Sequence, residues 1–174
     1  PFQMMFQHRQ VSKTYRAVAP VPADTAAAEQ ALSAQGLQVR SHIQKLRGRL
    51  QVQQLSEEQC AAQGVEPNTL TTAKILRTFT PSAQAVAGWR AEPNREWALY
   101  DLAPHTGKTH QLRAHLNMLS SPILGDVLYP KVLPDAPDRP EYPLQLLAYS
   151  LHFEHPITGE PVDLYSGRSL AAAS

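Results

Sequence analysis

The strongest constraint on the fold is a strand that is followed at once by a helix within residues 95–119. Large apolar residues recur at every second position over 95–102, which predicts a strand, and Pro104 should end it. Thr106 or Thr109 can cap the helix that follows, which should end near position 119. The same short span holds three histidines and an internal arginine, which core packing does not require. Candidate functional residues should therefore lie here.

The predicted helix has two different faces. An apolar stripe, with spacings of four and three residues, consists of Leu112, Leu116 and Leu119. A polar stripe, with spacings of three and four residues, consists of His110, Arg113 and Asn117. One face can pack against a sheet while the other presents polar groups together.

Residues 107–109 read Gly-Lys-Thr between a strand and a helix, which is the context of a phosphate-binding loop. The pattern fails at its first glycine, because position 102 is Leu, and that side chain would block the approach of a phosphate to the backbone. A nucleotide-binding protein that uses Lys108 is therefore the less favoured alternative.

The histidines lack the spacing of a metal site. His110 and His115 are five residues apart and would diverge by about 140° around a helix, whereas helical ligand pairs are three or four residues apart. His152 and His155 have an odd separation, which places them on opposite faces of a predicted strand. We expect solvated or hydrogen-bonded histidines rather than metal ligands.

Four blocks of the sequence occur in the order of a known signature. Residues 106–115 read TGKTHQLRAH, and residues 121–129 read SPILGDVLY. Residues 11–17 read VSKTYRA, and residues 146–159 read LLAYSLHFEHPITG. Together they resemble the RluA-type pseudouridine synthases, which are RNA-modifying enzymes, over nearly the whole chain.

A few positions depart from the family pattern. Lys108 replaces the usual arginine, Ser121 replaces a glycine and Leu147 replaces a histidine, while Pro130 follows Tyr129 where glycine is common. A lysine still supplies a cation for a phosphate, but it lacks the planar fork of arginine. The contact made by Lys108 therefore need not be the family's contact.

The order of the predicted elements suggests an α+β fold with a mostly antiparallel sheet, because the strands arrive in clusters. The resemblance implies more, namely the pseudouridine synthase catalytic fold: a curved sheet with flanking helices and an active-site cleft across its middle. We expect residues 1–174 to form a single domain, the C-terminal portion of such a catalytic domain, truncated at its N-terminus.

Several further elements are predicted from capping and alternation. A helix is expected over residues 24–35, with Asp24 as its N-cap and Gly36 as its stop, and Ser56 opens another helix with a capping box. Strands are expected over 49–55 and 70–79, and an irregular, proline-rich loop over 132–143.

The family's catalytic aspartate lies in a His-Arg-Leu-Asp-x-x-Thr-Ser-Gly block upstream of the strand at residues 11–17. No such block occurs in this sequence, and residues 1–10 resemble the helix that follows it. We therefore expect a fragment of a longer synthase. Without the strand and loop that hold the nucleophile, it should expose an unpaired strand edge or an apolar patch.

The resemblance also implies a reaction and three residues of the active site. The enzyme breaks the bond from ribose to N1 of a uracil and rejoins the ring through C5, with no metal and no organic cofactor. Arg113 matches the buried partner of the catalytic aspartate, Tyr15 the tyrosine that packs on the uracil and can take part in proton transfer at C5, and Leu146 an apolar wall. Without its aspartate, Arg113 should be a buried cation that lacks a partner, so the fragment alone should be inactive and marginally stable.

RNA contacts are predicted from basic residues in two regions. The net charge of +1 is a weak argument for nucleic acid, but no acidic residue occurs between Glu29 and Glu57, where basic residues gather around Gly48. The candidates are Lys45, Arg47 and Arg49 in this cluster, and Lys13, Lys108, His110 and Gln111 in the family blocks. A solvated basic turn is the competing interpretation of the cluster.

Composition fits this interpretation. The chain is 43% hydrophobic and 18% charged, which is typical of a globular domain, and its single Cys60 favours a reducing compartment. We expect a cytoplasmic, monomeric RNA pseudouridine synthase that acts on specific uridines of ribosomal or transfer RNA. The alternative is a noncatalytic RNA-binding module on the same scaffold.

Overall fold

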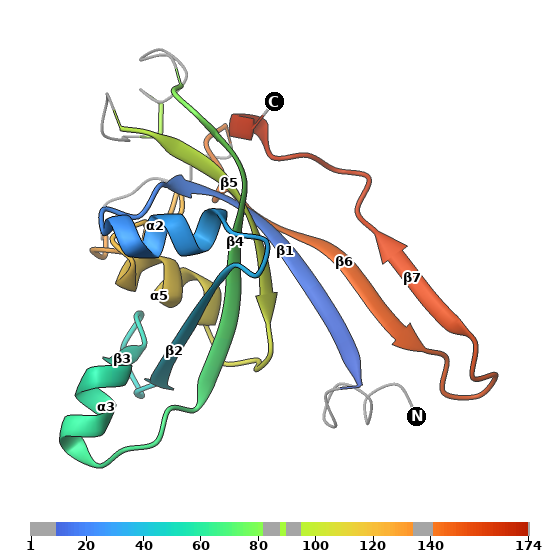
Figure 1. The fold of residues 1–174 in the computed structure, drawn as a ribbon, viewed down its shortest axis with the longest axis horizontal. Coiled ribbons are helices and arrows are strands. Elements are labelled where there is room, and N and C mark those ends of the chain that lie inside the picture. Colours follow the sequence, from blue (N-terminus) through green and yellow to red (C-terminus); the bar gives the residue numbers. More distant parts are fainter. Residues whose placement is uncertain (1–9, 82–87, 90–94, 134–140, 174) are drawn as a thin grey trace.

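The structure, a computed structural model, describes residues 10–81, 88–89, 95–133 and 141–173. Its strands are β1 (Val11–Pro20), β2 (Leu37–Gln44), β3 (Gln53–Ser56), β4 (Thr69–Phe79), β5 (Trp97–Pro104), β6 (Leu146–Glu154) and β7 (Pro161–Tyr165). Its helices are α2 (Thr25–Leu32), α3 (Glu57–Gln63), α5 (Gln111–Met118) and a short 3₁₀ helix, η1 (Ala171–Ala173). The described strands form one seven-stranded sheet in the order β3-β2-β4-β5-β1-β6-β7 (Figure 1).

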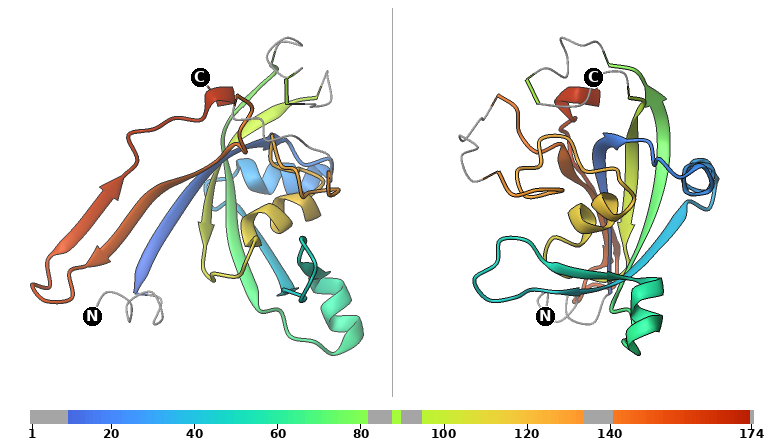
Figure 2. Two further views of the ribbon diagram at one scale, coloured as in Figure 1. Left: turned by 180° about the vertical axis from the view of Figure 1, so that it is seen from behind. Right: turned by 90° about the vertical axis from the view of Figure 1, so that its left-hand side faces the viewer.

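All neighbouring strands of this sheet are antiparallel, which confirms the predicted α+β class. Helix α5 packs against β2, β4 and β5, and α2 packs against β2 and β4. The hairpin of β6 and β7 extends away from these helices, as the views from opposite sides show (Figures 1 and 2). None of the helices in the described ranges is long and apolar enough to cross a membrane.

The sheet opens at β1, which lies next to its middle strand, β5. This strand pairs with β5 over residues 15–20 and with β6 over residues 11–17. Residues 11–14 therefore pair only with β6 among the described strands. Beyond Pro104 the chain turns away toward α5, so β1 and β5 diverge (Figure 1). The divergence leaves room for a cleft in the centre of the sheet.

The main hydrophobic core lies between this sheet and α5. Leu112 and Leu116 of the predicted apolar stripe are buried against Tyr100 and Leu102 of β5, and Leu119 packs at their border. The residues of the predicted polar stripe are all partly exposed. The two faces predicted for this helix are therefore confirmed.

Capping predictions are confirmed for two helices and wrong for the third. Asp24 caps α2 by accepting from the Ala27 amide at 2.7 Å, and Ser56 forms a reciprocal capping box with Gln59. Helix α5, in contrast, begins without a side-chain cap: His110 takes the N-cap position with a φ of 55°. The Thr106 hydroxyl instead donates to Gln111 and accepts from the Leu70 amide, so it fixes the preceding loop.

Two predicted boundaries also change. Helix α2 ends at Leu32, three residues early, because Ser33 turns to an extended conformation and bonds back to Gln30. Strand β3 starts only at Gln53, since residues 45–51 form a turn. Most of the predicted loop at 132–143 lies outside the described residues.

Candidate active site

A cavity of about 550 Å³ opens where β1 and β5 diverge. Its walls come from residues 11–15 of β1, from residues 103–108 after β5, from the first turn of α5 and from the start of β6. Seven of the predicted site residues line it: Lys13, Tyr15, Lys108, His110, Gln111, Arg113 and Leu146. Residues that are distant in the sequence thus meet around one cavity, and their roles toward RNA remain predictions.

The other three predicted site residues, Lys45, Arg47 and Arg49, lie on the exposed turn between β2 and β3. Lys45 donates to the backbone carbonyls of Arg49 and Leu50, so its ammonium group closes this turn. It also lines a second cavity of about 380 Å³ next to Lys108. The basic turn therefore borders the active-site region without entering the larger cavity.

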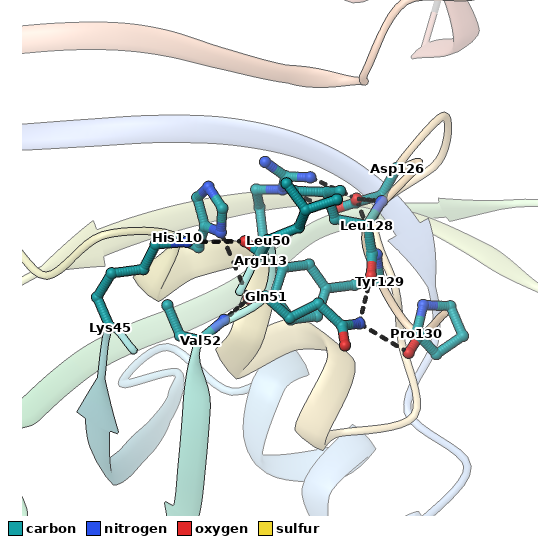
Figure 3. Close-up of polar contacts among 10 residues, drawn as sticks. All are labelled: Lys45, Leu50, Gln51, Val52, His110, Arg113, Asp126, Leu128, Tyr129 and Pro130. Carbon is teal, nitrogen blue, oxygen red and sulfur yellow. Dashed lines mark hydrogen bonds and ion pairs between the residues drawn. The ribbon is translucent and has the colours of Figure 1, made fainter. Parts of the chain in front are cut away.

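The expectation that Arg113 lacks a partner within this chain is wrong, because it pairs with Asp126 (Figure 3). Arg113 Nε donates to Asp126 Oδ2 at 2.8 Å, and Arg113 Nη2 donates to Asp126 Oδ1 at 2.6 Å. The Asp126 side chain is 0% exposed and that of Arg113 is 16% exposed. A bidentate, charge-assisted pair of this kind fixes the plane of the guanidinium.

The backbone after α5 explains how Asp126 reaches this position. Gly125 has a φ of 79°, and a Cβ there would lie 2.7 Å from the Pro143 carbonyl oxygen, so the turn requires glycine. Leu124 is held between β1 and the start of β6: its amide donates to Val18, and its carbonyl accepts from Gln145. Asp126 is therefore attached to the centre of the sheet.

Asp126 also organises the turn that follows it. Its Oδ1 accepts from the amides of Leu128 at 2.8 Å and Tyr129 at 3.0 Å. The Tyr129 ring then lies 5.5 Å from the Arg113 guanidinium, as a cation–π contact. The family resemblance of this block assigns no role to Asp126 or Tyr129; a carboxylate and an aromatic residue in a family block are the available signal.

Tyr129 connects the site to the basic turn. The Val52 amide donates to the Tyr129 hydroxyl at 2.9 Å, and His110 Nδ1 lies 3.4 Å from the same oxygen (Figure 3). Gln51 donates to the carbonyls of Leu128 and Pro130. Burial lowers the pKa of His110, and the positive charges of Arg113 and Lys45 lower it further. His110 is thus kept neutral near pH 7.

Gln111 is buried and fixes the loop in front of α5. Its Oε1 accepts from the Thr106 hydroxyl at 2.8 Å and from the Lys108 amide at 3.1 Å. Its Nε2 donates to Leu70 O at 3.1 Å and to Thr71 Oγ1 at 3.0 Å. A glutamine side chain has two N–H donors and two acceptor lone pairs, and all four are used here. Gln111 therefore positions the loop that presents Lys108.

Both ring nitrogens of His115 lie within hydrogen-bond distance of hydroxyl groups. Its Nδ1 lies 2.8 Å from Thr71 Oγ1, and its Nε2 lies 2.9 Å from Ser41 Oγ and 3.1 Å from Thr69 Oγ1. Thr71 Oγ1 also accepts from Gln111 Nε2 at 3.0 Å, so Gln111 and His115 share this hydroxyl. Burial lowers the pKa of His115 to about 4. Within the described residues, no cluster of three metal-binding side chains occurs.

The remaining two predicted catalytic residues form the apolar side of the cavity. Tyr15 is the cross-strand partner of Leu102 and is partly buried against the core, and Leu146 packs on the same core. Leu102 itself is buried inside β5. The position of the first glycine of a phosphate loop is therefore a strand residue, which argues against a nucleotide triphosphate site here.

A family model described as RNA pseudouridylate synthase matches residues 1–118 of this chain. Ribosomal large subunit pseudouridine synthase D of Vibrio cholerae is 35% identical over 107 residues, which are 55% of this chain and 33% of that protein. tRNA pseudouridine synthase C of Pasteurella multocida is 37% identical over 78 residues, which are 43% of this chain and 32% of that protein. An uncharacterized RNA pseudouridine synthase of Chlorobaculum parvum is 40% identical over 78 residues, 38% of this chain and 24% of that protein. The matches span only a quarter to a third of these relatives.

Two solved structures share the fold. Human RNA pseudouridylate synthase domain containing 1 has a TM-score of 0.62 at 24% identity, over 95% of this chain and 58% of that chain. Human RNA pseudouridylate synthase domain containing 4 has a TM-score of 0.56 at 22% identity, over 97% of this chain and 61% of that chain. Both likenesses concern the fold, including the sheet whose centre holds the cavity.

Proposed function

This chain belongs to the RNA pseudouridylate synthase family, and we propose that the protein isomerises specific uridines of structured ribosomal or transfer RNA to pseudouridine in the cytoplasm. The observation that supports this most is the convergence of Tyr15, Arg113 and Leu146 on one cavity. An aromatic ring, an apolar wall and a fixed cation are what a buried uracil and an ionised carboxylate need.

In the proposed reaction the target base leaves its stack and enters the cavity between Tyr15 and Leu146. An aspartate of the family's His-Arg-Leu-Asp block, which these 174 residues do not contain, attacks C1′ of the ribose, and the uracil leaves through N1 as an anion. Arg113 keeps that carboxylate ionised before the attack, because a nearby cation offsets the effect of burial on its pKa. C5 of the uracil then attacks C1′ and displaces the carboxylate; the C5 proton is lost with the help of Tyr15, and N1 takes up a proton.

The RNA backbone would follow the basic rim of the cavity. Lys108 is exposed between the two cavities, and Lys45 borders the smaller one. Arg47 and Arg49 continue this basic surface on the same turn. Phosphate contacts of this kind position the substrate without reading its sequence.

The test is release of tritium from RNA labelled at C5 of uridine. The polypeptide should be the chain together with the sequence that its gene encodes upstream, compared with residues 1–174 alone. We expect release by the former, unaffected by EDTA, and none by the latter. Arg113→Lys should lower the rate on the order of 100-fold, because one point charge replaces a fixed fork.

A matched control is Asp163→Asn, which removes an exposed carboxylate of β7 that pairs with His152, away from the cavity. This variant should keep the wild-type rate. RNA binding without tritium release by the upstream-extended protein would favour the noncatalytic RNA-binding module instead. Release by residues 1–174 alone would refute the need for the upstream aspartate.

A further inference from the structure

The pair of Arg113 and Asp126 uses only one edge of the guanidinium. Nε and Nη2 donate to the two oxygens of Asp126. A guanidinium has five N–H donors in a planar fork, so three remain: both of Nη1 and the second of Nη2. One hydrogen of Nη1 and one of Nη2 form a second edge, and the described residues accept no hydrogen bond from it. The side chain that bears this edge lines the larger cavity.

The negative charge of Asp126 is not devoted to Arg113 alone. Oδ1 accepts three hydrogen bonds, from Arg113 Nη2 and from the amides of Leu128 and Tyr129. The backbone amides share the stabilisation of the carboxylate, so Arg113 keeps part of its capacity to stabilise a second anion. Lys13 and Lys108 line the same cavity and add positive charge there.

Arg113 is also restrained on its face. The ring of Tyr129 lies 5.5 Å from the guanidinium carbon, and the Tyr129 hydroxyl is held by the Val52 amide. One edge of the guanidinium is bound by a carboxylate, one face lies near an aromatic ring, and the other edge is left for the cavity. A long side chain with many rotamers is thereby held in one orientation before any ligand arrives.

We propose that Asp126 is a positioning residue that holds the Nε edge of Arg113, so that the Nη1–Nη2 edge forms a binding site for a second carboxylate in the cavity. The inference rests on the proposed function, in which that carboxylate is the attacking aspartate. It adds that one arginine bridges two carboxylates with separate tasks. The second carboxylate binds to a guanidinium edge whose orientation is already fixed.

Formate is the probe for this second edge. In the full 174-residue chain labelled with ¹⁵N at its arginines, formate should shift the Nη1 resonance of Arg113 and leave its Nε resonance in place. In Asp126→Asn, the new amide NH₂ faces a guanidinium donor, so the Nε edge is released. Formate should then shift Nε and Nη1 alike. The unchanged backbone amide spectrum of each variant reports that it has folded.

If Asp126→Asn does not fold, Asp126→Glu serves instead, because it keeps the charge and displaces it by one methylene. It should reduce the ratio of the Nη1 shift to the Nε shift at least threefold. The inference is overturned if formate shifts Nε in the wild-type chain, or if every folded Asp126 variant keeps the wild-type selectivity for Nη1.

The activity of the upstream-extended protein gives the second readout. Asp126→Asn should lower kcat on the order of 100-fold with the KM for RNA within about twofold, and Asp126→Glu should restore part of kcat. A rise in the KM for RNA that parallels the fall in kcat would assign Asp126 to RNA binding and contradict the inference. If the wild-type protein shows edge-selective formate binding but no isomerisation, the proposed function fails while the arrangement of Arg113 stands.

Discussion

Two polar side chains of helix α5, Arg113 and His115, differ in how completely the protein satisfies their hydrogen-bonding groups. They are two residues apart and so project about 200° apart around the helix. His115 is 1% exposed, and both ring nitrogens are bonded to hydroxyls of β2 and β4. Arg113 is satisfied along one edge and retains donors at a cavity. The hydrogen bonds around His115, which we call the closed network, join the helix to the sheet. The contacts around Arg113, which we call the open network, leave donors for a ligand.

The largest effect is expected when Arg113 loses its charge. Arg113→Met leaves Asp126, whose side chain is 0% exposed, without its cation. We expect a loss of about 3–5 kcal/mol in the free energy of unfolding, as for other broken buried pairs. Urea denaturation of the 174-residue chain measures it. A loss below about 1 kcal/mol would mean that the backbone amides alone stabilise the carboxylate.

The closed network should respond to pH. The unfolded chain protonates His115 near its ordinary pKa of 6.5, whereas in the folded chain burial lowers that pKa to about 4. The unfolded state therefore binds more protons in this window, and stability falls as the pH is lowered from about 6.5 to 4, by up to about 3 kcal/mol. Unfolding curves at several pH values measure it.

His115→Asn is the control for this slope. The variant is less stable at pH 7, but its stability should fall less steeply between pH 6.5 and 4, because the titrating group is absent. His110 also has a lowered pKa and remains in both proteins, so the difference between the two slopes reports His115 alone. Equal slopes would contradict the assignment.

A smaller effect is expected at Gln111, which lies between the two networks. Gln111→Met keeps the size of the side chain but removes four hydrogen bonds that hold the loop at residues 106–108. We expect a loss of about 2 kcal/mol and faster amide exchange at Lys108. Hydrogen exchange followed by NMR checks both. An unchanged Lys108 amide would show that the loop is held without Gln111.

The smallest effect is expected at Ser56, which belongs to neither network. Ser56→Ala removes the capping box of α3 and should cost about 1 kcal/mol. It should leave the pH slope of His115 and the formate selectivity of Arg113 at their wild-type values. Any change in either would indicate that the two networks respond to global stability rather than to their own contacts.

Local patterns in the sequence predicted much of this architecture. The alternation before Pro104, the apolar stripe of α5 and the caps of α2 and α3 depend on near neighbours, and the structure confirms them. The partner of Arg113 could not be found in this way. Its position depends on the Gly125 turn and on Leu124 bonding to β1 and to the start of β6, which are contacts between distant segments. The uncapped start of α5 likewise follows from Gln111 holding Thr106 toward β4.

The pairing of β1 has a consequence for synthesis of the protein. Its partner for Pro20 is Trp97, and its partner for Val11 is Phe153. At about 5–20 residues per second, β1 leaves the ribosome several seconds before either neighbour has been made. The segment from α2 to β4 can pair locally in the meantime. The wall of the cavity that is translated first therefore waits for partners that are made much later, and until then its strand edges are open to pairing with other nascent chains.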